Sequence, residues 1–126
     1  MNLFACGLRY ATIPLAVREQ VVFSPASMAT ALREIKQLTQ AEEVVMLSTC
    51  NRTEFYGVNG QVTELCNWLC QTKQLSPELL QDAWYTYHHN AALRHLLRVA
   101  SGLDSVIVGE AQIVGQLKQA FFLLNL

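Results

Sequence analysis

Apolar and polar positions along this chain recur in periods that predict four strands and four helices. Strands are predicted where apolar runs or two-residue alternation dominate, and they cover residues 3–10, 43–49, 53–58 and 83–89. Helices are predicted where apolar residues recur every three to four positions, and they cover residues 24–39, 60–73, 90–102 and 110–124. Only a few residues separate the second strand from the third, so these two form a predicted hairpin.

The order of the elements predicts the fold class. Strand-helix-strand-strand-helix-strand is typical of the ferredoxin-like split β-α-β sandwich, so we expect an α+β fold with about four antiparallel strands and additional C-terminal helices. Ser24 as an N-cap and Pro25 at the first helical position support the start of the first helix. The last predicted helix is apolar and runs to the end of the chain without a cap, so we expect a fragment of a longer protein.

Composition narrows the classes of function. A length of 126 residues favours one domain with a core of its own. The net charge of −1 shows no overall excess of basic residues, so nucleic-acid binding is not inferred from charge. No apolar run has the length of a membrane span, and the N-terminal segment lacks the pattern of a signal peptide. Four cysteines in no zinc or redox spacing indicate a reducing, cytoplasmic setting and no metal site.

One cysteine differs from the other three. Cys6, Cys66 and Cys70 fall on predicted core faces, whereas Cys50 lies at the tip of the predicted hairpin, in the segment LSTCNRTEFYGV. A thiol there is chemically useful when it is ionised, because the thiolate is the nucleophile, and Arg52 two residues on favours that form. The local sequence leaves two interpretations open: a nucleophile, or a turn cysteine with no role.

The predicted helix 90–102 carries a histidine away from its leucines. At 100° per residue, four apolar residues cluster on one side of it: Leu93, Leu96, Leu97 and Ala100. His95 lies opposite with Arg94 and Arg98, so we do not expect a buried core histidine. His95 is either solvated or lines a cleft beside the two arginines.

Two glutamines share one stripe of the last predicted helix. Gln112 and Gln116 flank its apolar seam, and Gly109 allows a sharp entry to the helix. This pair either lies on the protein surface or binds a small polar ligand.

Three segments of the chain resemble one known family. They are GLRYATIPLAVRE (7–19), STCNRTEFY (48–56) and HLLRVASGLDSVIVGEAQIVGQLK (95–118), and together they resemble the N-terminal part of bacterial-type glutamyl-tRNA reductase. The resemblance implies that residues 1–126 form the N-terminal catalytic, glutamate-recognition domain. It also implies a long connecting helix that starts near residue 110, followed by an NADPH-binding domain and a dimerisation domain that this chain lacks.

The resemblance assigns roles to individual residues. Cys50 would be the nucleophile that attacks the aminoacyl ester of glutamyl-tRNA, and His95 would protonate the departing ribose oxygen or orient the substrate. Arg52 would bind the glutamate side-chain carboxylate through its fork, and Glu110 would take the α-ammonium. The full set of implied substrate-binding residues is Thr49, Asn51, Arg52, Ser105, Glu110, Ala111, Gln112 and Gln116.

The same resemblance implies cofactors and partners. NADPH would bind in the missing downstream domain and reduce the thioester to glutamate-1-semialdehyde, the first step of the C5 route to tetrapyrroles such as heme. No metal and no membrane are expected. The expected partners are glutamyl-tRNA, a second copy of the enzyme and glutamate-1-semialdehyde aminomutase. One departure stands out: the family usually reads Asn-His where this chain has Arg9-Tyr10, so no imidazole is available at position 10.

Two other classes of function are alternatives to a glutamyl-tRNA reductase domain. A non-enzymatic ferredoxin-like module that binds RNA or a ligand would use exposed strand aromatics as stacking platforms; the candidates are Phe55, Tyr56, Tyr85 and Tyr87. A thiol hydrolase would use Cys50 and His95, and it would turn over without a nicotinamide cofactor.

Overall fold

The computed structural model describes residues 2–49 and 51–101, and within them a four-stranded antiparallel sheet forms the centre of the fold. The strands are β1 (Leu3–Leu8), β2 (Glu43–Ser48), β3 (Thr53–Val58) and β4 (Trp84–His88), in the order β2-β3-β1-β4. The strand β3 separates β1 from β2, as the split β-α-β pattern requires. The predicted α+β, ferredoxin-like fold class is confirmed.

The helices are α1 (Leu15–Gln20), α2 (Pro25–Thr39), α3 (Leu65–Lys73), α4 (Pro77–Leu80) and α5 (Asn90–Ala100), with short 3-10 turns at Tyr10–Thr12 and Gln81–Ala83. The predicted N-cap of α2 is confirmed, because the Ser27 backbone N–H donates to the Ser24 hydroxyl at 3.2 Å. The helix predicted from residue 60 begins only at Leu65. The helices α1 and α4 were not predicted, since four to six residues are too few for an apolar period to show. The helix predicted at 110–124 lies outside the described residues.

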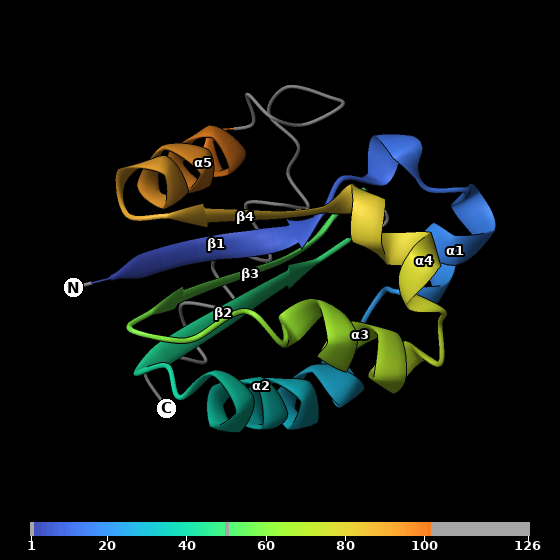
Figure 1. The fold of residues 1–126 in the computed structure, drawn as a ribbon, viewed down its shortest axis with the longest axis horizontal. Coiled ribbons are helices and arrows are strands. Elements are labelled where there is room, and N and C mark those ends of the chain that lie inside the picture. The colour runs from blue at the N-terminus through green and yellow to red at the C-terminus, as the bar shows by residue number, and fades with distance from the viewer. Residues whose placement is uncertain (1, 50, 102–126) are drawn as a thin grey trace.

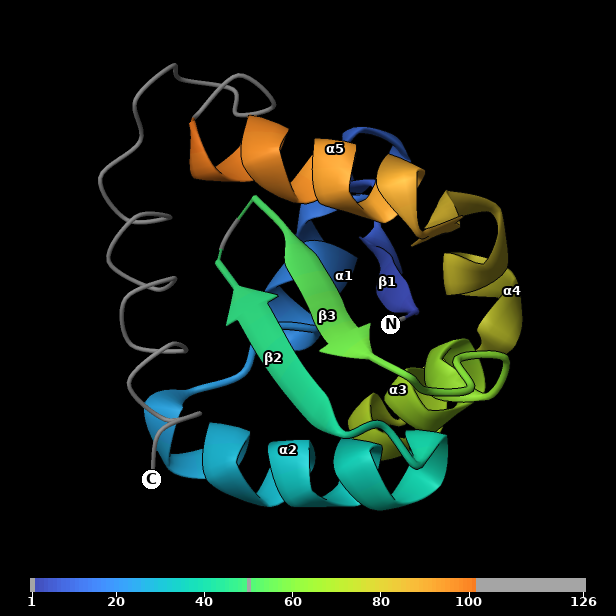
Figure 2. The same cartoon turned by 90° about the vertical axis from the view of Figure 1, so that its left-hand side faces the viewer.

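The sheet is covered by helices on both faces. Figure 1 shows α2 and α3 along one face and α5 across the other, and Figure 2 shows the same layers from the side. The larger core cluster lies between the sheet and α2 and α3; its most buried large side chains include Phe4, Ile35, Met46, Phe55, Leu65 and Leu69. The smaller cluster lies under α5 and consists of Ala5, Leu47, Tyr56, Ala92 and Val99.

The register of the strands brings four chain segments to one edge of the sheet. The end of β1 at Leu8 pairs with the starts of β3 at Thr53 and of β4 at Trp84. The end of β2 at Ser48 pairs with Thr53 as well. One residue further in, Gly7, Leu47, Glu54 and Tyr85 form the next row, and because side chains alternate between faces, this row points toward α5. The candidate site lies at this edge.

The orientation of α5 corrects the prediction for His95. Leu93 and Leu97 are 46% and 59% exposed, while Ala92 and Val99 are buried against the sheet. His95 is on this inner face, and its side chain is only 12% exposed. The predicted apolar face was wrong because the rings of Tyr56 and Tyr87 already occupy the sheet face under α5, so small residues and a histidine fit there and Leu93 and Leu97 turn outward.

Candidate active site

The turn between β2 and β3 is closed by a threonine. The Thr49 hydroxyl accepts hydrogen bonds from the backbone N–H groups of Asn51 and Arg52, both at 3.1 Å. The Thr49 N–H donates to the Arg52 carbonyl oxygen at 2.8 Å. A side chain that satisfies its own turn in this way fixes the local backbone. Cys50 itself lies outside the described residues, but its two neighbours in sequence are held.

Glu54 is the centre of the polar groups between the sheet and α5. It is 1% exposed. Its Oε1 accepts a hydrogen bond from Arg52 Nη1 at 2.8 Å, and its Oε2 contacts both the Tyr85 hydroxyl and His95 Nε2. One buried carboxylate therefore links the arginine of the turn to the histidine of α5.

The room for this carboxylate comes from a glycine opposite it. A Cβ added at Gly7 would lie 2.4 Å from the Thr53 carbonyl oxygen and 2.9 Å from Glu54 Cα. Any larger residue at position 7 would displace β3 at the point where Glu54 leaves the backbone.

The imidazole of His95 is packed among tyrosines. Its ring centroid lies 5.0 Å from that of Tyr87, 5.2 Å from that of Tyr85 and 6.3 Å from that of Tyr56. The Tyr85 hydroxyl is also 3.3 Å from His95 Nε2. The Nε2 atom of His95 therefore faces Glu54 and Tyr85.

The surroundings of Glu54 decide its charge. Burial on its own would raise the pKa of the carboxyl, but hydrogen bonds from His95, Arg52 and Tyr85 and the positive charge of Arg52 together lower the pKa below its usual value. The same burial, with the adjacent carboxylate, raises the pKa of Tyr85 far above its usual value, so its hydroxyl stays protonated and donates. Glu54 is an anion in the folded chain at neutral pH.

Residues 9–23 are tied to the same edge of the sheet by hydroxyl groups. The Tyr10 hydroxyl is hydrogen-bonded to Thr53 Oγ1 at 2.6 Å, and the Phe23 backbone N–H donates to the Ser48 hydroxyl at 2.9 Å. Tyr10 is buried and serves the fold through this bond.

A cavity of about 410 Å³ opens at this edge. Its lining residues are Leu8, Arg9, Tyr10, Ala11, Arg18, Asn51, Arg52, Tyr85, Tyr87, His95 and Arg98. Of the residues predicted from the sequence, the structure brings Asn51, Arg52 and His95 together here, and Thr49 supports them from the turn. For His95 the interpretation of a cleft beside arginine holds with Arg98, whereas Arg94 does not line the cavity. Other predicted site residues lie outside the described residues: Cys50, Ser105, Glu110, Ala111, Gln112 and Gln116.

The sequence reasoning missed Glu54, Arg9, Arg18 and the tyrosine pair of β4 as parts of the site. A signal existed for Glu54, because it is a lone carboxylate within a short strand whose other residues are apolar, aromatic or hydroxyl-bearing. A charged residue at such a position needs a buried partner. No comparable signal marked Arg9 or Arg18, since charged residues in loops and short helices are usually solvated.

The described cysteines are core residues, as predicted. Cys6 is fully buried, Cys70 is 2% exposed, and Cys66 packs against the larger core cluster. Burial raises the pKa of Cys6 far above its usual value and, with the neighbouring Cys70, raises the pKa of Cys66 to about 11. Burial also raises the pKa of Cys70. None of these three thiols forms an appreciable amount of thiolate at neutral pH.

We therefore expect Cys50 to be the first thiol that iodoacetamide modifies in the native chain near pH 7. With a pKa of about 11, Cys66 would be ionised in only about one molecule in 10,000 at that pH. Peptide mapping after a short pulse would identify the labelled residue. Labelling of Cys66 or Cys70 ahead of Cys50 would contradict the packing described here, and labelling in denaturant serves as the control in which all four react.

The aromatic side chains of the sheet do not form an RNA-stacking surface. Phe55 is fully buried, Tyr56 is 4% exposed and Tyr85 is 9% exposed. Tyr87 is partly buried and packs against the cluster under α5. The structure thus removes the platforms on which the RNA-binding alternative depended.

Two classes of site receive no support from the described part of the chain. Among residues 2–49 and 51–101, no group of three or more His, Cys, Asp or Glu side chains is placed to hold a metal ion. No helix in the same range has the length and apolar character needed to cross a bilayer.

Comparisons with known proteins agree with this fold. A family model described as the glutamyl-tRNA(Glu) reductase N-terminal domain matches residues 6–125. The chain is 48% identical over 123 residues to a glutamyl-tRNA reductase of Chromohalobacter salexigens and 46% identical over 121 residues to one of Shewanella oneidensis. Each match covers 96% of this chain and 29% of the relative. The solved structure of a glutamyl-tRNA reductase from Methanopyrus kandleri superposes with a TM-score of 0.70 at 28% identity, covering 98% of this chain and 28% of that one.

Proposed function

Because this chain belongs to the family of glutamyl-tRNA reductase N-terminal domains, we propose that it holds the site at which a longer enzyme takes glutamate from glutamyl-tRNA. The observation that supports this proposal most directly is the cavity at the sheet edge. It is lined by Asn51 and Arg52, which follow Cys50 in the chain, and by His95 from α5.

The proposed reaction is a transfer of the glutamyl group to sulfur. The Cys50 thiolate attacks the ester carbonyl carbon, a carbon–sulfur bond forms, and the bond to the ribose oxygen breaks. The ribose oxygen takes up a proton and tRNA leaves, so that the product is a glutamyl thioester on Cys50. An aminoacyl ester is already activated, and a thiolate is a strong nucleophile without a dedicated base beside it.

The polar residues of the turn and cavity would hold the substrate. Arg52 is the candidate for the side-chain carboxylate of the glutamyl group, because a guanidinium binds a carboxylate with two parallel hydrogen bonds. Its Nη1 is held by Glu54, which orients the rest of the guanidinium group before substrate arrives. Five further residues remain predicted substrate contacts: Ser105, Glu110, Ala111, Gln112 and Gln116.

His95 would act on the departing ribose oxygen or orient the ester. In either role its ring is held by Glu54 and Tyr85 through Nε2. A general acid must lie within hydrogen-bond reach of the atom it protonates, and a ring with one nitrogen anchored satisfies that condition more often than a mobile one.

The remaining steps belong to the longer protein. There, NADPH would supply a hydride that reduces the thioester to glutamate-1-semialdehyde for tetrapyrrole synthesis. The described residues do not fit that cofactor, because none of β1, β2, β3 and β4 is followed by a glycine-rich turn and helix. Dimerisation, contact with glutamate-1-semialdehyde aminomutase and a cytoplasmic location are further parts of the proposal.

The test is to trap the thioester. The 126-residue chain would be mixed with glutamyl-tRNA carrying labelled glutamate, quenched in acid and analysed by intact-protein and peptide mass spectrometry. The proposal requires one glutamyl adduct, on the peptide that contains Cys50, and it must be removed by hydroxylamine. An adduct on another cysteine, or no adduct while tRNA is deacylated by the chain, would exclude the thioester route.

A second prediction concerns the reading of the side-chain carboxylate. Arg52→Lys keeps the charge but loses the fork, so the preference for glutamyl-tRNA over glutaminyl-tRNA is expected to fall by roughly tenfold or more. Because Arg52 is also the partner of Glu54, the change will lower stability, which affects both substrates alike. The ratio of the two rates of thioester formation is therefore the informative quantity. Arg33→Lys, on the exposed side of α2, is the matched control; an unchanged ratio in Arg52→Lys would mean that another residue reads the carboxylate.

A further inference from the structure

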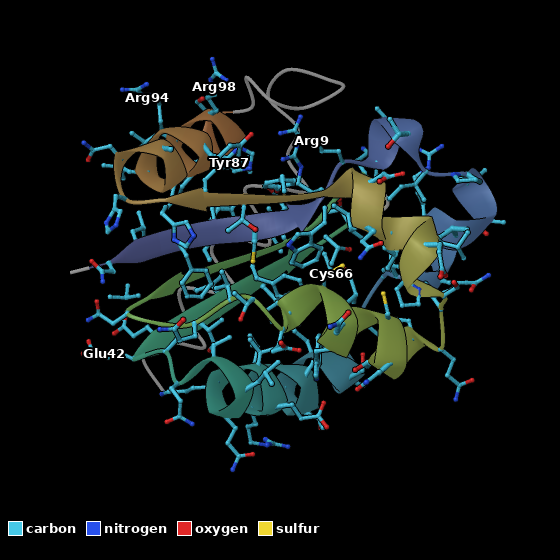
Figure 3. The ribbon with its side chains drawn as sticks, in the orientation of Figure 1. Arg9, Glu42, Cys66, Tyr87, Arg94 and Arg98 are labelled. Atoms are coloured by element: carbon cyan, nitrogen blue, oxygen red, sulfur yellow. The ribbon has the colours of Figure 1, made fainter. Side chains whose placement is uncertain are left out.

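Arginine is concentrated at the cavity that holds the proposed site. Four of the six arginines in the chain line it: Arg9, Arg18, Arg52 and Arg98. No aspartate or glutamate is among its described lining residues. Although the whole chain has a net charge of −1, the described lining of this cavity is strongly positive. Figure 3 shows Arg9 and Arg98 on the side of the molecule that carries Tyr87 and α5, with Glu42 at the opposite edge.

Only one of these four charges is neutralised within the described part of the chain. Arg52 pairs with Glu54 at 2.8 Å. Arg9 has neutral partners: its Nη2 donates to the Tyr87 hydroxyl at 3.0 Å, and its Cζ lies 5.5 Å from the centre of the Tyr85 ring. Arg18 and Arg98 form no ion pair with any described residue, and the buried Nε of Arg18 has no hydrogen-bond partner there.

The glutamyl group does not supply the missing negative charge. Its side-chain carboxylate carries −1, its α-ammonium carries +1 and its ester is neutral, so its net charge is zero. Among the described residues, the guanidinium groups of Arg9, Arg18 and Arg98 would then remain without a paired anion beside a bound glutamyl ester. The nearest anion that is covalently attached to this ester in a tRNA is the phosphate on the 5′ side of the terminal nucleotide.

We propose that Arg9, Arg18 and Arg98 bind the phosphodiester of the terminal nucleotide of glutamyl-tRNA, while Arg52 serves the glutamyl group. This inference rests on the function proposed above. Guanidinium groups bind phosphate oxygens with paired, charge-assisted hydrogen bonds. Arg9 is held in place by Tyr85 and Tyr87, so it loses less side-chain entropy on binding than a solvated arginine would.

In this proposal the phosphate and the glutamyl group are bound by different arginines of one cavity. The phosphate contact sets where the terminal ribose lies, and this position brings the ester carbonyl within reach of the nucleophile. Positioning of this kind is sequence-independent, as phosphate contacts generally are.

Two stable substrate analogues test this assignment. Both carry glutamate in amide linkage to the 3′ position of 3′-amino-3′-deoxyadenosine, and only one carries a 5′-phosphate. In calorimetric titrations with the 126-residue chain at low salt, the phosphate is expected to improve Kd by roughly tenfold. The phosphate-bearing analogue should also lose more affinity with added salt than the analogue without phosphate, because salt screens the contact between the phosphate and the guanidinium groups.

Single variants test which arginines bind the phosphate. In Arg9→Gln and in Arg98→Gln, the ratio of the two Kd values is expected to fall toward one. Arg94→Gln is the matched control, because Arg94 is exposed on the same helix but does not line the cavity, and it should keep the wild-type ratio. Circular dichroism of each variant confirms that the fold persists.

Each contrary result points to a different error. Equal Kd values for the two analogues in the wild type would overturn the phosphate assignment and leave the proposed function standing. Failure of both analogues to bind would remove the proposed function and this inference with it. If the phosphate still improves Kd in both Arg9→Gln and Arg98→Gln, the phosphate binds elsewhere. Binding of adenosine 5′-phosphate or inorganic phosphate as tight as that of the full analogue would indicate a free-anion site, and the assignment to tRNA would be wrong.

Discussion

Cys50→Ser is expected to abolish glutamyl transfer to this chain, with a fall of roughly 1000-fold or more in the rate of glutamate release from glutamyl-tRNA. A cysteine provides a few per cent of thiolate at neutral pH even without activation, whereas a serine hydroxyl must lose its proton to a base. Among the described residues of the cavity, His95 is the only imidazole, and its Nε2 is bonded to Glu54 and Tyr85. The described lining residues thus include no second imidazole that could activate a serine.

The measurement is release of labelled glutamate from glutamyl-tRNA, with wild type, Cys50→Ser and Cys66→Ser side by side. Cys66 is a core thiol outside the cavity, so Cys66→Ser controls for a general effect of removing sulfur. In the wild type we expect slow release without NADPH, because water hydrolyses the thioester. Release that continues undiminished in Cys50→Ser would show that the thiol is not the nucleophile, and fast cofactor-independent turnover would favour the thiol hydrolase.

The parts of the fold that follow from local pattern were predictable. The strand 53–58 was predicted with the bounds that β3 has, and the Ser24–Pro25 start of α2 was found because capping chemistry depends on neighbouring residues only. The α5 helix was predicted as an element, but its buried face was not. That face depends on which side of the sheet carries Tyr56, Tyr85 and Tyr87, and the pattern of α5 itself does not show this.

Those residues of the candidate site that were predicted were predicted from the resemblance to the family. Asn51, Arg52 and His95 were named, and they meet at one cavity. Glu54 was not named, because its role arises from contacts with Tyr85 and His95 that lie 31 and 41 residues away. The arginine cluster was hidden for the same reason: three separate segments contribute to it, while the net charge of the chain is close to zero.

Glu54→Gln is expected to lower the free energy of unfolding by about 3–5 kcal/mol at pH 7, since it leaves a buried arginine without its counter-ion. The exposed fractions of the paired side chains are 10% for Arg52 and 2% for Glu54, so solvent does little to replace the lost interaction. Glutamine preserves the shape of the residue and still accepts one hydrogen bond, which restricts the change to charge. Urea unfolding followed by circular dichroism measures the effect, and the exposed Glu43→Gln on β2 is the matched control, expected within about 0.5 kcal/mol of wild type.

The pH dependence of the same variant tests the cause. The folded-state pKa of Glu54 is lower than its ordinary value of 4.5, so its contribution is fully present above that value and is lost as the pH falls through the folded-state pKa. The difference in stability between wild type and Glu54→Gln should therefore shrink as the pH falls below about 4.5. A difference that stays the same down to acid unfolding would mean that packing, not charge, explains the loss.

Combining Glu54→Gln with Arg52→Met should lower the free energy of unfolding by less than the sum of the two single changes, because the double variant leaves neither member of the pair charged in the interior.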